Sequence, residues 1–253
     1  MMFSNIKSFY KKIIGFDKLF NQSISIQNNL IALHKKSDEL YWGMIFNNAV
    51  SNSDWLINRS FNPGRWAAGY PMLYILFRIY NDIKPVNILE FGLGESTKLA
   101  YQYNKSFPES HLKIIEQDKA WLDYFSNQIF DIRENTTILE IEQVMIEGVK
   151  VNQYKNLLNI LKQKKFDMII IDGPLGSPQN SRYQIVDMVL NDVIAKDFII
   201  IMDDYNRLGE KQTIEKLKLV LNEKNIIFSE GVYSGIKDTY IVCSKQFDFL
   251  TSL

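Results

Sequence analysis

Strand–helix alternation from residue 86 onward constrains the fold of this chain most strongly. Short apolar runs alternate with segments whose apolar residues recur at helical spacing. Such alternation predicts a doubly wound α/β sheet with right-handed crossovers between parallel strands. The expected strands cover residues 86–91, 112–115, 136–141, 166–171, 198–202, 226–229 and 239–243, and the expected helices cover 95–103, 119–130, 154–164, 181–194 and 209–223.

The last two expected strands are too close together for a helix between them. Only a turn at Tyr233-Ser234-Gly235 interrupts the segment, so the strands should form an antiparallel hairpin. The prediction is therefore a seven-stranded, Rossmann-like sheet that ends in a C-terminal antiparallel hairpin. Ligands of such sheets bind at the carboxyl ends of the parallel strands.

The first 60 residues follow a different pattern. Residues 3–20 carry apolar side chains on one face among several lysines, which predicts a basic amphipathic helix that lies on an anionic membrane surface or packs on protein. Heptad-like spacing follows, and residues 24–48 are a candidate dimer contact or a helix packed on the domain. We predict an N-terminal helical extension over residues 1–60 and an α/β domain over 61–253. The heptad-like positions are Ile26, Leu30, Leu33, Leu40 and Met44.

Composition narrows the classes of partner and the compartment. The chain has 29 basic residues (Lys and Arg) and 29 acidic residues (Asp and Glu). This balance of charge gives no argument for a nucleic-acid partner. The single cysteine, Cys243, excludes an intrachain disulfide and a thiolate metal site, as is typical of a reducing compartment. No apolar run is long enough to predict a transmembrane helix. We expect a cytoplasmic protein, with peripheral contact at the inner membrane surface as the alternative for its basic helix.

The motif Ile88-Leu89-Glu90-Phe91-Gly92-Leu93-Gly94-Glu95-Ser96-Thr97 joins a buried strand to a helix through two glycines. Glycines let the backbone turn tightly against a ligand, and the helix start offers free N–H groups to an anion. Glu116 ends the next strand, where an acid can bind the hydroxyls of a ribose; a solvent-exposed acid is the alternative. A nicotinamide enzyme would place a third glycine at position 97, where this chain has a threonine. The expected cofactor-binding residues are Glu90, Gly92, Gly94, Ser96, Thr97, Glu116 and Asp172.

With these motifs, residues 86–245 resemble the class I S-adenosylmethionine (AdoMet)-dependent methyltransferases. The resemblance implies that the Gly92–Gly94 loop holds the methionine part of AdoMet and that Glu116 holds the ribose. It would place the adenine near residues 143–148. A nicotinamide- or nucleotide-sugar-dependent enzyme on a related sheet and a non-catalytic scaffold of the same fold are the alternatives.

Three acids follow neighbouring strands. Asp172 directly follows the run 166–171, and Asp203 and Asp204 directly follow the run 198–202. Neighbouring strands lie about 4.8 Å apart, so these carboxylates should converge. The spacing is similar to that of catechol-type O-methyltransferases, which implies that Asp172, Asp203 and Asp204 bind Mg²⁺ or another divalent cation. In the metal-free alternative, Asp172 is the general base and Asp203 is structural.

Two further segments resemble methyltransferases that modify glycans, namely the glucuronoxylan 4-O-methyltransferases and bacterial capsule-locus enzymes. They are the loop 173–178 with Ser181-Arg182-Tyr183, and Asn62-Pro63-Gly64-Arg65-Trp66. This resemblance implies O-methylation of a sugar or phosphorylated glycan precursor in surface-polysaccharide biosynthesis. Arg65 and Arg182 would bind its acidic group, and Trp66, Trp55 or Tyr70 would stack on the sugar or on adenine. Surface ion pairs and a packed lid are the alternatives. The predicted catalytic residues are Asp172, Asp203 and Arg182.

Overall fold

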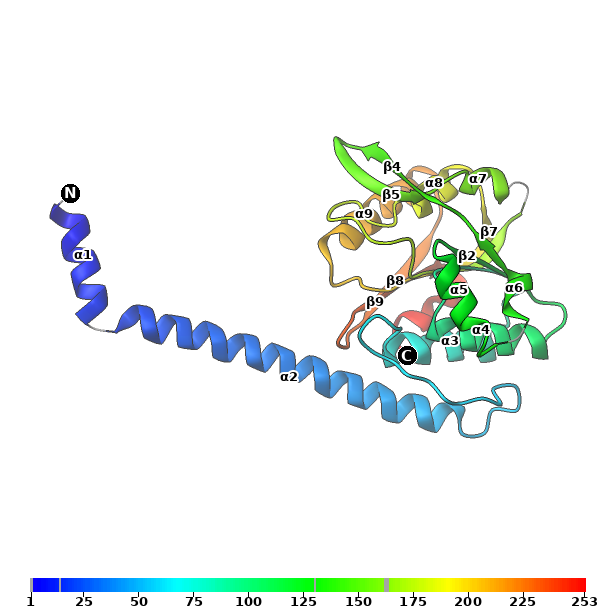
Figure 1. Cartoon of the computed structure of the whole chain (residues 1–253), viewed down its shortest axis with the longest axis horizontal. Coiled ribbons are helices and arrows are strands. Elements are labelled where there is room, and N and C mark those ends of the chain that lie inside the picture. The colour runs from blue at the N-terminus through cyan, green and yellow to red at the C-terminus, as the bar shows by residue number, and fades with distance from the viewer. Residues whose placement is uncertain (1, 14, 130, 162–163) are drawn as a thin grey trace.

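A computed structural model describes residues 2–13, 15–129, 131–161 and 164–253, and it is built around one seven-stranded sheet (Figure 1). The strand order is β3-β2-β1-β6-β7-β9-β8, in which β9 runs antiparallel to both β7 and β8 while the other pairs are parallel. The predicted fold class and C-terminal hairpin are therefore confirmed. The strands are β1 (Asn87–Phe91), β2 (His111–Glu116), β3 (Thr136–Ile138), β6 (Phe166–Ile171), β7 (Ile194–Met202), β8 (Phe228–Tyr233) and β9 (Thr239–Ser244).

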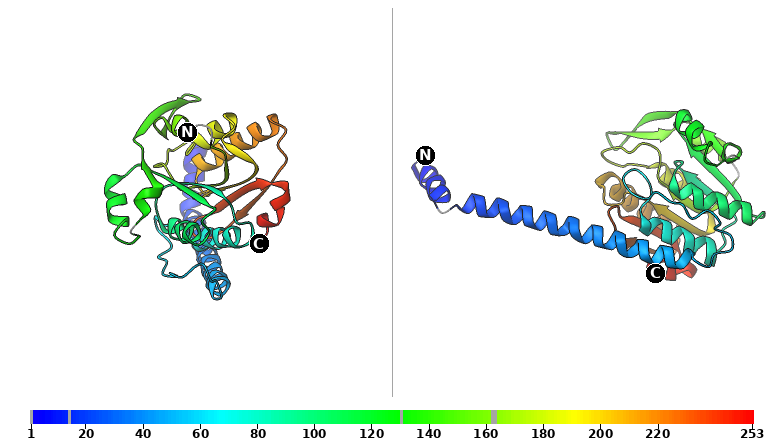
Figure 2. Two further views of the ribbon diagram at one scale, coloured as in Figure 1. Left: turned by 90° about the vertical axis from the view of Figure 1, so that its right-hand side faces the viewer. Right: turned by 60° about the horizontal axis from the view of Figure 1, so that its bottom comes forward.

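Helices cover both faces of the sheet (Figures 1 and 2). Side chains of a strand alternate between its faces, so Ile88 and Met168 pack into a core with α3 and α4, while Leu89 and Ile169 pack into a second core with α8 and α9. The helices of the body are α3 (Tyr70–Asp82), α4 (Glu95–Ser106), α5 (Lys119–Phe125), α6 (Ile132–Asn135), α7 (Leu157–Ile160), α8 (Gln184–Leu190) and α9 (Leu208–Glu223), followed by the 3₁₀ segment η1 (Lys245–Thr251).

The segment between β3 and β6 differs from the sequence prediction. A separate two-stranded hairpin, β4 (Ile141–Ile146) with β5 (Val149–Tyr154), lies between the expected strand 136–141 and the expected helix 154–164, where no strand or helix was predicted. Its turn places Glu147 and Gly148 at positive φ, the geometry of a two-residue hairpin turn, although the pair is not the usual Asn-Gly. The expected helices 119–130, 154–164 and 181–194 are also shorter than predicted, and residues 130 and 162–163 lie outside the described residues.

The N-terminal segment forms two helices, α1 (Met2–Ile13) and α2 (Phe16–Val50). Gly15 between them has φ 63°, a left-handed conformation that ends a helix, so the expected single helix over 3–20 is wrong; residue 14 lies outside the described residues. The first half of α2 extends away from the body as a stalk (Figures 1 and 2). Within the described residues, no helix combines the length and apolar character needed to cross a membrane.

The end of α2 belongs to the body. Phe46 and Val50 are buried together with Trp55 and Leu56 in the core that contains α3. The core therefore contains residues from both sides of position 60, where the sequence suggested a domain boundary. The heptad-like residues point away from this contact, because Ile26, Leu30, Leu33, Leu40 and Met44 are all at least 53% exposed.

Candidate active site at the carboxyl edge of the sheet

A cavity of about 530 Å³ opens at the carboxyl ends of β1, β2, β6 and β7. This volume lies in the range of small-molecule sites. The cavity brings together several residues that the sequence singled out from distant positions. Those that line it are Gly92, Gly94, Glu116, Asp172, Arg182, Asp204, Arg65 and Trp66.

The two glycines of the loop differ in what surrounds them. Gly92 has φ 90°, and a Cβ there would lie 2.8 Å from the carbonyl oxygen of Asp172. A side chain at Gly92 would therefore collide with the neighbouring strand end. A Cβ on Gly94 would meet no described atom within 4 Å, so the space beside it is open to a ligand. The Gly94 N–H donates to Thr97 Oγ1 at 2.9 Å and fixes the start of α4.

Glu90, Ser96 and Thr97 support this loop and do not line the cavity. Glu90 is fully buried, and it accepts a hydrogen bond of 2.5 Å from the hydroxyl of Ser96. Burial raises the pKa of Glu90 to about 8, since a desolvated carboxylate is costly. Glu90, Ser96 and Thr97, which were predicted to contact the cofactor, thus support the loop from inside the protein.

Glu116 is held rigidly at the cavity wall by backbone donors. One oxygen accepts from the N–H of Leu93 at 2.8 Å, and the other accepts from Gln117 at 2.6 Å and Asp118 at 2.8 Å. A carboxylate has about four acceptor sites, so about one is left for a ligand hydroxyl. The expectation of two ribose hydroxyls on Glu116 therefore needs a second acceptor, and Asp118 also lines the cavity.

Sequence reasoning missed the aromatic part of the cavity wall. Trp121 and Phe125 on α5 and Tyr154 at the end of β5 line the cavity. The Trp121 indole N–H donates to the carbonyl of Leu93 at 2.6 Å, which attaches the ring to the glycine loop. Residues 143–148, where the adenine was expected, are in the β4–β5 hairpin and do not line the cavity. The available signal was the aromatic pair Trp121 and Phe125, spaced by one helical turn in the helix that follows Glu116.

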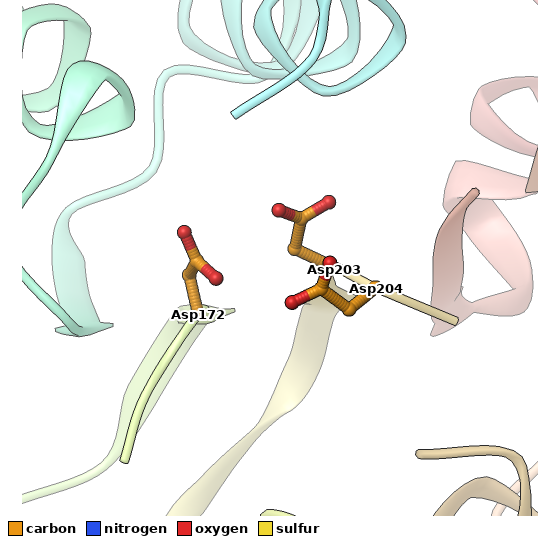
Figure 3. Close-up of side chains that lie close together, drawn as sticks. All are labelled: Asp172, Asp203 and Asp204. Carbon is orange, nitrogen blue, oxygen red and sulfur yellow. The ribbon is translucent and has the colours of Figure 1, made fainter. Parts of the chain in front are cut away.

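Asp172, Asp203 and Asp204 converge as predicted (Figure 3). Their nearest carboxylate oxygens all lie within 4.8 Å of one another. Asp172 faces the cavity, whereas Asp203 is fully buried behind its wall. Burial and the nearby Asp203 carboxylate raise the pKa of Asp172 to about 7. A carboxylate with this pKa suits a general base at neutral pH.

Three cationic side chains, two of them buried and one exposed, already pair with these acids. Buried Arg182 donates to Asp172 at 3.1 Å and to Asp204 at 3.0 Å. Lys237 Nζ lies 2.6 Å from Asp203 Oδ2, and Arg207 Nη1 lies 2.9 Å from Asp204 Oδ2. Both terminal nitrogens of Arg182, which was expected to bind an acidic substrate, thus donate to groups inside the protein: Nη2 to these two acids and Nη1 to backbone carbonyls.

This donor set does not fit a divalent cation. Mg²⁺ needs near-octahedral oxygen ligands at about 2.0–2.1 Å. Here the ammonium of Lys237 lies among the carboxylates, 2.6 Å from Asp203 and 3.5 Å from Asp204. Two like unit charges at 4 Å repel by about 4 kcal/mol at the effective dielectric of a protein surface, and a divalent ion would double this.

Two of the remaining predicted substrate residues line the cavity and one does not. Arg65 and Trp66 are exposed at the cavity, and Trp66 keeps 87% of its surface accessible. Tyr70 does not line the cavity; its ring packs 6.0 Å from that of Phe46 between α3 and α2.

Several solved structures resemble the fold. One is the O-methyltransferase TomG from Streptomyces achromogenes, solved in complex with SAM. Its alignment covers 83% of this chain and 97% of TomG at 13% sequence identity, with a TM-score of 0.50. An SAH-bound methyltransferase from Podospora anserina covers 80% and 94% at 15% identity, with a TM-score of 0.47. An O-methyltransferase from Bacillus cereus in complex with SAH covers 83% and 92% at 16% identity, with a TM-score of 0.46. At such identities the likeness concerns the fold.

Sequence comparison finds different relatives. A glutamyl-tRNA reductase from Chloroherpeton thalassium is 22% identical over 258 residues, which cover 95% of this chain and 59% of the reductase. A second, from Listeria welshimeri, is 22% identical over 177 residues, which cover 67% and 39%. The chain thus spans only part of the length of these relatives. No protein-family model matches it.

Proposed function

We propose that this protein is an AdoMet-dependent O-methyltransferase. The observation that carries the proposal is the meeting of three elements in one cavity: the Gly92–Gly94 loop, the Glu116 carboxylate and the Asp172 carboxylate. The loop would hold the methionine part, Glu116 would bind a ribose hydroxyl, and the indole of Trp121 would contact the adenine. The strand order, with antiparallel β9 beside β7, supports the same proposal.

The chemistry assigned to Asp172 is removal of one proton. The acceptor oxygen forms a bond to the methyl carbon as the bond from that carbon to the sulfonium sulfur breaks, and the electron pair stays on sulfur. The hydroxyl proton passes to Asp172, whose pKa of about 7 suits this transfer near neutral pH. Little further activation is needed, because most of the catalysis lies in alignment of the two reactants.

The acceptor is proposed to be a sugar or a phosphorylated glycan precursor, as in surface-polysaccharide biosynthesis. Arg65, Arg207 and Lys237 give the cavity cationic groups, and exposed Trp66 offers a ring face for a sugar. Guanidinium groups bind carboxylates and phosphates with two parallel hydrogen bonds. Arg65 keeps the role expected of it, and Arg207 takes the role expected of Arg182, because both side chains are exposed.

Calorimetric titration with S-adenosylhomocysteine tests the cofactor assignment. We expect micromolar binding, and we expect Gly94→Ala to weaken it because the new methyl group enters the open space beside the loop. Methyl transfer from labelled AdoMet to a panel of uronic acids and sugar phosphates then tests the acceptor class. Binding of NADPH in place of S-adenosylhomocysteine would overturn the proposal.

A reductase is the second candidate, because both curated relatives carry that name. Two features disfavour it. The nicotinamide fingerprint needs a third glycine where this chain has Thr97, and antiparallel β9 interrupts the parallel sheet on one side.

We also propose that the stalk pairs with a second copy of the chain. Lys35, Glu39, Trp42 and Phe46 face the body, whereas the opposite face of α2 carries exposed apolar residues at a/d spacing. Because α2 is unbroken from Phe16 to Val50, this register also includes Leu19. The residues of the face, which we call the outer stripe, are Leu19, Ile26, Leu30, Leu33, Leu40 and Met44, each exposed by 53–73%.

A self-association accounts for the outer stripe better than a membrane surface does. Two copies of the stripe would bury on the order of 1,000 Å², near the lower limit for a specific interface. The charges of α2 balance, with Lys18, Lys35 and Lys36 against Asp17, Asp38 and Glu39, so this helix offers an anionic bilayer no net attraction.

A further inference from the structure

Lys237 is a cation of the acid cluster to which the cofactor assignment gives no role. It lies in the loop between β8 and β9, and its side chain is only 9% exposed. It nevertheless lines the same cavity as Asp172 and the glycine loop. A lysine buried at this depth has to compensate for its desolvation, and here a carboxylate does so.

The ammonium is fixed by two acids and still has capacity to bind. Its hydrogen bond to Asp203 Oδ2 is 2.6 Å long, and Asp204 Oδ1 lies at 3.5 Å. An ammonium carries three donors, and this hydrogen bond uses one of them. Burial lowers the pKa of Lys237, but the carboxylates of Asp203, Asp172 and Asp204 raise it more, so the net shift is upward. The group is therefore charged at neutral pH.

We propose that Lys237 is a catalytic residue that takes the place of a divalent cation in this cluster. Its ammonium donates a hydrogen bond to the acceptor oxygen, holds it beside Asp172 and stabilises the negative charge that develops as the proton leaves. This assignment rests on the proposed methyl transfer. Lys237 keeps all its protons in the step: Asp172 receives the hydroxyl proton, and the sulfur keeps the electron pair of the broken bond.

The loop that carries Lys237 is built to keep it in place. The indole N–H of Trp42 donates to the carbonyl of Ser234 at 2.9 Å, and Lys35 pairs with Asp238 at 3.1 Å. Both partners lie on α2, so the stalk helix and the sheet hold the loop from two sides. A donor held in position before the reaction contributes more to catalysis than a mobile one.

The test compares wild-type protein with Lys237→Ala, and it uses Lys211→Ala as the matched control, since Lys211 is exposed and lies outside the cavity. Mn²⁺ binding is followed by electron paramagnetic resonance, which requires no methyl transfer. We expect wild type and control to bind Mn²⁺ only weakly, and Lys237→Ala to bind it at least about tenfold more tightly because three carboxylates lose a competing cation. The kcat of Lys237→Ala should fall about 10²-fold, while wild-type activity should not change with EDTA.

A second variant distinguishes loss of the catalytic role from loss of the fold. Lys237→Met with Asp203→Asn removes both charges of the buried pair, so the fold is kept without an unpaired carboxylate. This variant should bind S-adenosylhomocysteine like wild type and yet lose kcat to the same extent as Lys237→Ala. Tight Mn²⁺ binding by wild type, or unchanged kcat in either variant, would overturn the role of Lys237. Failure of S-adenosylhomocysteine binding in wild type would instead remove the methyltransferase assignment, and the Mn²⁺ comparison would still stand.

Discussion

The carboxylate of Glu39 accepts a hydrogen bond of 3.0 Å from the backbone N–H of Ile236, a residue 197 positions away in the chain. Its other oxygen accepts from the N–H of Tyr70 at 2.6 Å. Glu39 thus connects α2, the start of α3 and the loop that carries Lys237.

Glu39→Ala should loosen this loop. Two backbone donors lose their partner, which we expect to cost about 1–3 kcal/mol in the free energy of unfolding. Urea denaturation measures this loss, and amide hydrogen exchange at Ile236 locates it. Asp38→Ala, an exposed change on the same helix, is the control. Equal protection of Ile236 in both variants would contradict the linkage.

The two glycines of the loop should respond differently to alanine. Gly92→Ala places a methyl group 2.8 Å from a carbonyl oxygen at φ 90°, so we expect it to lower stability by about 2 kcal/mol or more. Gly94→Ala meets no described atom, so its stability should match wild type while its affinity for S-adenosylhomocysteine falls. Thermal unfolding and calorimetry separate the two effects. Equal loss of stability in both would refute this account of the loop.

Glu90 should make stability depend on pH. Its folded pKa is raised to about 8, so the folded state holds a proton that the unfolded state releases from about pH 4.5 upward. The unfolding free energy therefore falls as pH rises between about 4.5 and 8, by roughly 3–5 kcal/mol if Glu90 acts alone. Glu90→Gln keeps an acceptor for Ser96 and removes the titration. Urea denaturation at pH 5 and pH 9 should show a smaller pH dependence in the variant than in wild type.

Asp172 should control the pH dependence of the reaction. Only its ionised form accepts a proton, and its pKa lies at about 7, so kcat should rise through pH 7 and then level off. Asp172→Asn should lose about 10²–10⁴-fold in kcat and lose this rise. Initial rates from pH 5.5 to 9 at saturating AdoMet provide the measurement. A variant that retains both rate and pH profile would require a different base.

Negative charge in the outer stripe should separate the dimer. Leu33→Glu with Leu40→Glu places like charges at facing positions, and we expect the dimer dissociation constant to rise at least about 100-fold. Sedimentation equilibrium measures it, and Asn28→Glu, which adds charge away from the stripe, is the control. A monomeric wild type that sediments with anionic vesicles would instead identify a membrane as the partner.

Apolar pattern and strand position were enough to predict the sheet and its acids. The run Phe166–Ile171 is apolar except for Asp167, as expected of a strand buried on both faces, and Asp172 follows it directly. Because parallel strands share one carboxyl edge, the meeting of Asp172 with Asp203 follows from topology alone. The β4–β5 hairpin was missed because its Glu-Gly turn is a weak local signal.

The partners of those acids could not be predicted in the same way. Lys237 comes from the hairpin loop beyond the last helix, and Arg182 turns inward to two acids and two carbonyls. Such pairings depend on how separate loops pack on the sheet, and no local spacing encodes them. Trp121 was overlooked for a similar reason, since its contact with Leu93 exists only once β1 and β2 are paired.

The docking of α2 also determines where this chain can be shortened. A fragment that starts at residue 61 would lack Phe46, Val50, Trp55 and Leu56 from its interior, together with the three α2 side chains that hold the Lys237 loop. We expect such a fragment to expose apolar surface and aggregate. The chain can instead be truncated in the half of the stalk that does not contact the body, before Lys35. We expect such a truncation to weaken self-association and to leave catalysis intact.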